Sequence, residues 1–133
     1  LHVLDYDAER GTLRDVQTVS TLPSGFTGKP WAADLHLSPD GRTLYASERT
    51  TSTLSSFRVN QTNGQLEPLG QVPTEKTPRG FAVDSSGKFL ISTGQESHSV
   101  SVHPIDAATG LPGTPTRIPA GKNPNWVEIV DLP

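Results

Sequence analysis

The sequence predicts an all-β fold built from repeated four-stranded units, and three observations carry this prediction. The 133 residues include 12 Gly and 12 Pro, which favour turns and disfavour long helices. Turn glycines recur at a spacing of 46 residues, Gly41 with Gly87 and Gly64 with Gly110. Short apolar runs between these turns keep the same spacing. A period in the forties with four strand-sized runs per unit is typical of a β-propeller.

The N-terminal segment, residues 1–20, is expected to end one propeller blade. Val3–Tyr6 and Val16–Val19 lie on either side of Gly11 and alternate in the manner of two paired strands. The residues from Ser24 to Lys29 then form a longer loop.

A complete blade is expected over residues 31–73. Its first two strands are joined by Ser38-Pro39-Asp40-Gly41, in which Pro presets φ at the second turn position and Gly takes the demanding last one. Asn63-Gly64 marks the turn between its last two strands. The expected strands are Asp34–Leu37, Leu44–Ser47, Thr53–Val59 and Gly70–Val72.

A second complete blade is expected over residues 78–119, with a single strand of a closing blade over residues 124–131. The expected strands are Phe81–Asp84, Phe89–Thr93, Val100–Ile105 and Thr116–Ile118, followed by Trp126–Val130. Two strands before the full blades and one after them do not close a ring, and open sheet edges invite aggregation. We therefore expect the C-terminal portion of a seven-bladed propeller, closed by the remaining N-terminal blades or by another chain. A small β-sandwich is the alternative, which the constant spacing disfavours.

Composition excludes several classes of function. The net charge of −3 gives no support for binding to nucleic acid or to a membrane surface. No apolar run approaches the roughly 18 residues that cross a bilayer. There is no Cys, and the His and carboxylate residues do not cluster, so neither a metal nor a cofactor is expected. No nucleophile-elbow motif or Gly-rich phosphate loop is present.

Four stretches resemble one family, the 6-phosphogluconolactonase (lactonase) family of seven-bladed β-propellers. They read K-P-W-A-A-D-L-H-L-S-P-D-G-R-T-L-Y, E-R-T, T-P-R-G-F-A-V-D-S-S-G-K-F-L and G-K-N-P-N-W-V, and they begin at Lys29, Glu48, Thr77 and Gly121. The resemblance implies a cytoplasmic enzyme that hydrolyses 6-phospho-glucono-1,5-lactone to 6-phosphogluconate in the pentose phosphate pathway. A muconate-lactonizing type of enzyme on the same fold, or a propeller that only binds partners, remains an alternative.

One rim of the propeller is expected to hold the substrate, because it carries the connections at the channel mouth rather than the tight turns. Arginine suits a phosphate because its planar fork forms two parallel charge-assisted hydrogen bonds. Arg49 and Arg79 are the candidates, unless they are merely solvated or paired with Glu48 or Glu96. The predicted substrate-binding residues are Arg79, Arg49, Lys29, Trp31, Gln95 and His98.

Asp34 and His36 are the predicted catalytic pair. They share one face of an inner strand at a separation of about 6.6 Å along it. His36 would serve as the base with Asp34 fixing its tautomer, or the pair would instead act as a structural clamp. His98 is a second candidate base, whereas His2 and His103 are expected on the strand surface. Trp31 and Trp126 are expected mainly to pack between blades.

Overall fold

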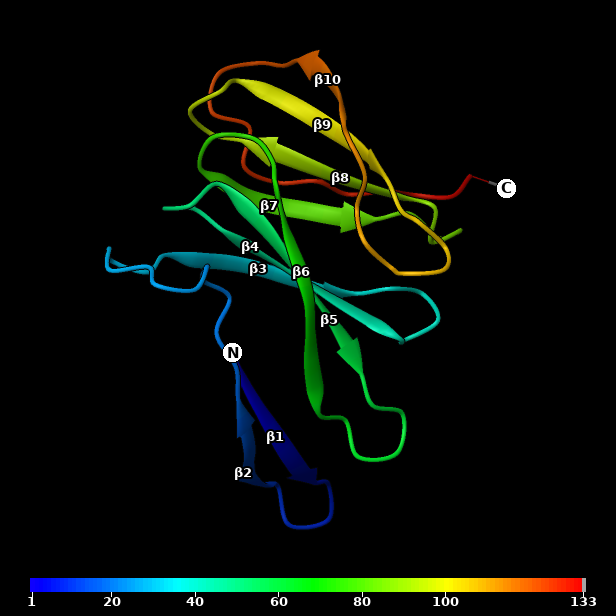
Figure 1. Cartoon of the computed structure of the whole chain (residues 1–133). Coiled ribbons are helices and arrows are strands. Elements are labelled where there is room, and N and C mark those ends of the chain that lie inside the picture. The colour runs from blue at the N-terminus through cyan, green and yellow to red at the C-terminus, as the bar shows by residue number, and fades with distance from the viewer. Residues whose placement is uncertain (133) are drawn as a thin grey trace.

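The computed structural model describes residues 1–132 and consists of ten strands in three antiparallel sheets, without a helix in that range (Figure 1). The first sheet has two strands and the other two have four each. The strands are β1 (His2–Asp7), β2 (Thr12–Thr18), β3 (Ala32–Leu37), β4 (Thr43–Glu48), β5 (Thr53–Val59), β6 (Leu66–Pro73), β7 (Pro78–Val83), β8 (Phe89–Gly94), β9 (Ser99–Pro104) and β10 (Thr116–Pro119).

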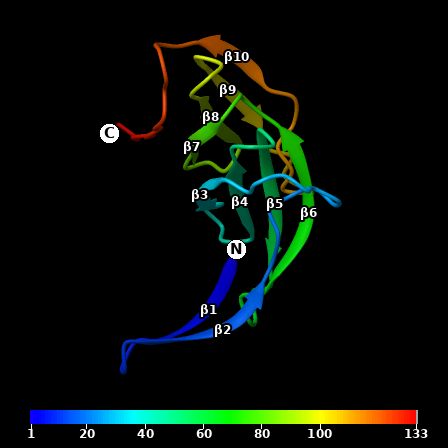
Figure 2. The same cartoon turned by 90° about the vertical axis from the view of Figure 1, so that its left-hand side faces the viewer.

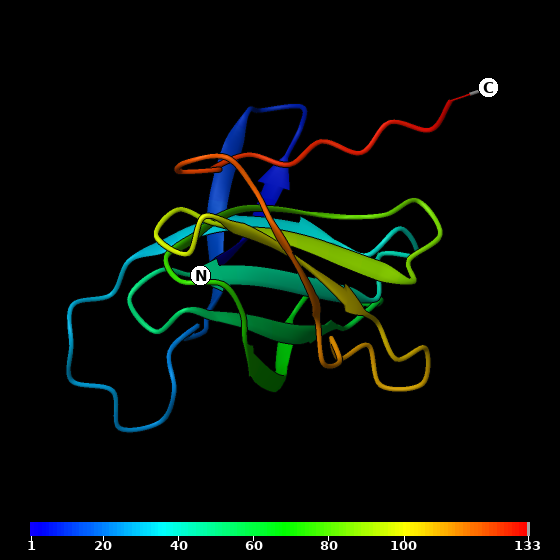
Figure 3. The ribbon, with the colours of Figure 1, turned by 90° about the horizontal axis from the view of Figure 1, so that it is seen from above.

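Each four-stranded sheet is a simple meander, β3-β4-β5-β6 and then β7-β8-β9-β10. The three sheets follow one another as neighbouring blades, with β3 and β7 side by side (Figures 1 and 2). The loop that joins β2 to β3 extends away from the sheets (Figure 3). The predicted all-β fold with two full blades and partial blades is therefore confirmed. No helix among residues 1–132 is long and apolar enough to cross a membrane.

The predicted turns are also confirmed. Gly41 and Gly87 adopt φ of 70° and 69°, and each donates its N–H to the carbonyl three residues earlier, on Ser38 and Asp84. Gly64 and Gly110 have φ of 71° and 76° in the turns between the last two strands of each blade. Glycine is favoured at such positions because a Cβ strains a left-handed backbone.

Two apolar clusters hold the sheets together. One packs the first sheet against the first full blade (β3–β6), and the other packs the two full blades against each other. The first consists of Leu44, Ala46, Phe57 and Leu66 with Leu1, Val3, Val19 and Val59, and the second of Tyr45, Leu54, Phe81 and Leu90 with Val72, Val83 and Ile105. Leu35 and Leu37 remain 53% and 54% exposed, because the two-stranded first sheet does not reach the inner end of this face.

One expectation was wrong and another stays a prediction. Trp126–Val130 pairs with none of the described strands, and its expected partner is a strand of the remaining N-terminal blades, so its assignment to a closing blade stays a prediction. The segment nevertheless passes next to β7 (Figure 1), where a Cβ on Gly80 would lie 2.7 Å from the carbonyl oxygen of Asn125. His103 is not on the surface but 0% exposed, since the chain that returns from β9 to β10 covers it.

Candidate functional site

The rim opposite the tight turns has an unusual backbone. Among the described residues, the four non-glycine positions with left-handed φ all lie there, at Ser52, Thr77, His98 and Asn123, with φ of 54–56°. They form two pairs that are 46 residues apart. Ser52 and His98 lie in the β4–β5 and β8–β9 turns, and Thr77 and Asn123 lie just before β7 and before the segment Trp126–Val130. Such conformations are costly for residues with a Cβ and concentrate at functional sites.

His98 ties two of these connections together. Its Nδ1 accepts the backbone N–H of Asn123 at 3.3 Å, and in the preceding blade Ser52 Oγ accepts the N–H of Thr77 at the same distance. A ring nitrogen that accepts a hydrogen bond carries no proton, so the neutral ring presents Nε2–H outward. His98 is therefore placed as a hydrogen-bond donor at the rim and is poorly placed as a base.

Glu48 anchors the rim of the first full blade. Its fully buried carboxylate accepts the backbone N–H of Trp31 at 2.5 Å and that of Thr51 at 2.6 Å. The guanidinium carbon of Arg49 lies 3.8 Å from the centroid of the Trp31 ring, a cation–π contact. Trp31 therefore serves as a platform for Arg49 and does not pack between blades as we expected.

Arg49 and Arg79 form a cationic pair across the boundary between the two blades. Burial and the charge of Arg79 lower the pKa of Arg49, and Glu48 opposes this. The Nε of Arg49 is buried and has no hydrogen-bond partner among the described residues. The alternative ion pairs are not formed, because Glu48 holds backbone amides and Glu96 pairs with Lys76 at 2.9 Å. Two neighbouring positive charges with an unpaired N–H donor are suited to binding an anion.

Asp34 and His36 meet on β3. His36 Nε2 lies 3.1 Å from Asp34 Oδ2, and the two side chains are 41% and 25% exposed. Asp34 Oδ2 also accepts the backbone N–H of Phe81 in the next blade at 3.3 Å, while the ring of His36 meets Phe81 edge-on at 4.9 Å. The pair thus combines both geometries that we considered, an oriented imidazole and a clamp between blades.

β-Bulges lie beside both candidate groups. The register of β3 shifts between Ala32 and Leu35, and that of β7 shifts between Pro78 and Phe81. Bulges redirect side chains and are common next to active sites. These two lie at Asp34 and Arg79, so the bulges set the direction of the predicted catalytic and phosphate-binding residues.

The remaining residues of interest lie on the same rim, where the structure fixes their backbones rather than their side chains. Lys29 is exposed in the loop before β3, and its carbonyl accepts the hydroxyl of Thr50 at 2.8 Å. Gln95 is half-buried after β8, where its N–H donates to the carbonyl of Thr77 at 3.2 Å. Trp126 is 70% exposed.

Sequence reasoning missed Glu75, which anchors the second blade. It is 2% exposed and accepts hydrogen bonds from Ser99 (2.5 Å) and Ser101, and its carboxylate pairs with Arg117 at 3.0 Å. Burial raises the pKa of this carboxyl, but the hydroxyl groups and the arginine outweigh that effect and lower it. The available signal was a break in the repeat, because Gly94 stands where the first blade has Glu48, and Glu75 packs against that glycine.

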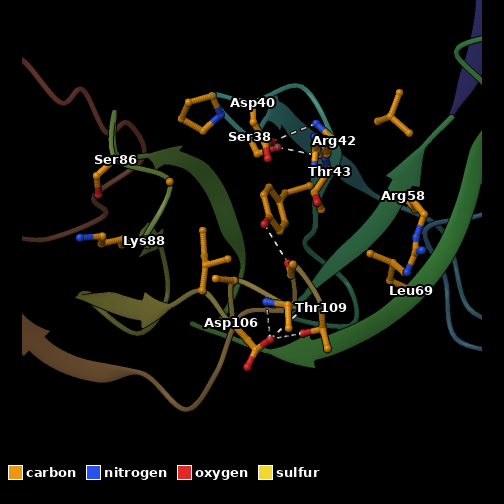
Figure 4. A pocket seen from close by; sticks show the side chains of 18 of the residues that line it. Ser38, Asp40, Arg42, Thr43, Arg58, Leu69, Ser86, Lys88, Asp106 and Thr109 are labelled. Atoms are coloured by element: carbon orange, nitrogen blue, oxygen red, sulfur yellow. Dashed lines mark hydrogen bonds between the residues drawn. The ribbon is translucent and has the colours of Figure 1, made fainter. Parts of the chain in front are cut away.

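A cavity of about 590 Å³ opens on the opposite rim between the turns of the two full blades (Figure 4). Its carboxylates are engaged in turn structure, since Asp40 accepts the Ser38 hydroxyl and Asp106 accepts the N–H groups of Ala108 and Thr109. The Ser38 hydroxyl is the main reason that the pKa of Asp40 is lowered. Both carboxylates of this cavity are thus held in turns and are not available as an acid or base, so we take the other rim as the candidate site.

The described residues include no group of three or more His, Asp or Glu side chains arranged to hold a metal ion. The chemistry that the rim offers therefore consists of hydrogen-bond donors, two arginines and one Asp–His pair.

Comparisons with known proteins agree with this architecture. Residues 1–129 match the family described as "Lactonase, 7-bladed beta-propeller". The chain is 50% identical over 119 residues to the 6-phosphogluconolactonase of Photorhabdus laumondii and 48% identical over 115 residues to that of Serratia proteamaculans. These alignments cover 90% and 86% of this chain but only 36% and 35% of the relatives, so the chain spans about a third of their length.

Solved structures give the same picture. The periplasmic gluconolactonase of Pseudomonas aeruginosa superposes with a TM-score of 0.86 at 32% identity, over 92% of this chain and 34% of that one. A protein from Lactobacillus plantarum superposes with a TM-score of 0.91 at 27% identity, over 98% of this chain and 38% of that one.

Proposed function

Because the chain belongs to the lactonase family of seven-bladed β-propellers, we propose that it works within a complete propeller that hydrolyses 6-phospho-glucono-1,5-lactone to 6-phosphogluconate. The 6-phosphogluconolactonases at 50% and 48% identity support this substrate. The remaining blades of the ring would complete the site. We place the enzyme in the cytoplasm, because a phosphate dianion does not cross a membrane unaided.

The cationic pair carries this proposal. Arg49 and Arg79 stand close enough for the charge of one to lower the pKa of the other, and the buried Nε of Arg49 has no partner among the described residues. A phosphate dianion would neutralise both guanidinium groups and accept that donor. Lys29, Gln95 and the Nε2–H of His98 would supply further donors around the sugar.

The Asp34–His36 pair would supply the base. Asp34 holds the Nε2 side of the imidazole, which leaves Nδ1 free to accept a proton. A water molecule would lose its proton to Nδ1 while its oxygen attacks the lactone carbonyl. The ring C–O bond then breaks, and the departing ring oxygen takes the proton, which opens the lactone to the carboxylic acid. His36 lies three residues beyond the position equivalent to Arg79, about 10 Å further along the channel.

The test compares the complete propeller with its Arg79→Ala variant. We expect hydrolysis of the phosphorylated lactone above its spontaneous rate. Loss of a charge-assisted hydrogen bond worth about 1.5–3 kcal/mol should raise KM roughly 10- to 100-fold and change kcat less. Arg14→Ala is the control, because Arg14 pairs with Asp5 on the first sheet. Equal kinetics of Arg79→Ala and Arg14→Ala would remove Arg79 from the site, and no hydrolysis by the parent would favour a propeller that only binds.

A further inference from the structure

A single buried hydroxyl connects the two bulges that carry the candidate site. Ser47 lies on β4 and is 0% exposed. Its Oγ accepts the backbone N–H of Asp34 at 3.1 Å within its own blade, and it donates to the backbone carbonyl of Arg79 in the next blade at 3.2 Å. The hydroxyl therefore acts as an acceptor at the β3 bulge and as a donor at the β7 bulge.

The bulges explain why these bonds are needed. Where a strand bulges, its ladder is interrupted and its backbone groups must find other partners. In β7 the carbonyl of Gly80 accepts a hydrogen bond from the Thr93 hydroxyl at 3.0 Å, and the N–H of Phe81 donates to the Asp34 carboxylate at 3.3 Å. Ser47 completes this arrangement at Arg79.

We propose that Ser47 is a positioning residue that fixes Arg79 relative to the Asp34–His36 pair. The inference rests on the proposed function, in which Arg79 binds the phosphate and His36 activates water. The side chain of Arg79 is long and exposed, so its backbone is the part that the fold can fix. A small displacement between the phosphate site and the base would move the lactone carbonyl out of reach of the activated water, which is costly for catalysis.

The test measures phosphate discrimination in the complete propeller. This quantity is kcat/KM for the phosphorylated lactone divided by kcat/KM for unphosphorylated glucono-1,5-lactone. We expect Ser47→Ala to lower it about three- to tenfold, the range that one hydrogen bond supports. Ser47→Cys keeps the shape of the side chain with a slightly larger atom and weakens both hydrogen bonds. It should also lower phosphate discrimination, and it serves as the test if the alanine variant fails to fold.

Ser56→Ala is a matched control. Ser56 is a serine of the same blade that is 1% exposed, but its Oγ has no hydrogen-bond partner within residues 1–132. Its removal should leave discrimination unchanged, which separates loss of the Ser47 bonds from loss of a buried hydroxyl as such.

The outcomes distinguish this inference from the proposed function. If Arg79→Ala lowers discrimination but neither Ser47 variant does, the positioning role is overturned and the phosphate site stands. If Arg79→Ala also leaves discrimination unchanged, the phosphate site is overturned, and the role of Ser47 with it. If phosphate discrimination falls in both Ser47 variants and stays unchanged in Ser56→Ala, the positioning role is supported.

Discussion

Glu48→Gln tests whether the buried carboxylate is the anchor of the rim. The substitution nearly preserves shape but removes an acceptor. One oxygen of Glu48 accepts the N–H of Trp31 at 2.5 Å, and the other accepts the N–H and the hydroxyl of Thr51 at 2.6 and 2.7 Å. An amide has one oxygen, so it can serve Thr51 or Trp31 but not both.

The expected loss follows from these three bonds. The amide that keeps the two Thr51 bonds places its NH₂ against the N–H of Trp31, which loses a bond to a charged acceptor worth about 1.5–3 kcal/mol. The two remaining bonds weaken because the acceptor is no longer charged. Removing a buried charge offsets part of this loss. We expect the free energy of unfolding to fall by about 2–3 kcal/mol.

Denaturant unfolding of the complete propeller measures this change, with Glu67→Gln as the control. Glu67 is exposed on β6, so the same chemical change there should alter the free energy of unfolding by less than about 0.5 kcal/mol. If Glu48→Gln is as stable as Glu67→Gln, the carboxylate does not anchor the rim, and the reasoning about Trp31 and Arg49 fails with it.

Two further predictions concern acid stability and the C-terminal segment. Burial lowers the pKa of His103 from its usual 6.5, so below that value the unfolded chain binds more protons than the folded one. The free energy of unfolding should therefore fall as pH drops below about 6.5 and until the lowered pKa is passed, and His103→Gln should remove this slope from a pH series of unfolding curves. Gly80→Ala should lower the free energy of unfolding by about 1–3 kcal/mol, because its Cβ would lie 2.7 Å from the Asn125 carbonyl oxygen. Gly121→Ala, whose added Cβ would meet no atom of the described residues within 4 Å, should change stability by less than about 0.5 kcal/mol, and equal stabilities of the two variants would show that the segment does not press on β7.

The strands and turns could be predicted because their signals are local. Pro39 and Gly41 specify their turn through their own backbone preferences, and the 46-residue spacing transfers the assignment to Gly87. The same locality leaves the strand at Trp126–Val130 a prediction. That stretch has the pattern of a strand, but pairing depends on a neighbouring strand that the pattern cannot supply.

The site was only partly predictable, because its geometry depends on contacts between blades. Alternation placed Asp34 and His36 on one face, and the structure brings them to 3.1 Å. Nothing local shows that Asp34 also reaches the backbone of Phe81, or that His103 lies under the chain returning from β9. Such contacts are set by how closely two sheets approach.

The repeat also shows where the cationic pair is unique. The next boundary between blades carries Gln95 and Asn125 at the positions of Arg49 and Arg79. Both are uncharged amides, although the connections that hold them have the same left-handed backbone at His98 and Asn123. The backbone geometry of the rim is therefore common to both boundaries, whereas the pair of arginines is confined to the boundary that Ser47 and Asp34 bridge. Arginines at only one of two equivalent boundaries favour a ligand that places its anionic group there. We therefore expect the phosphate at the boundary of β4 and β7 and the uncharged part of the sugar toward Gln95 and His98.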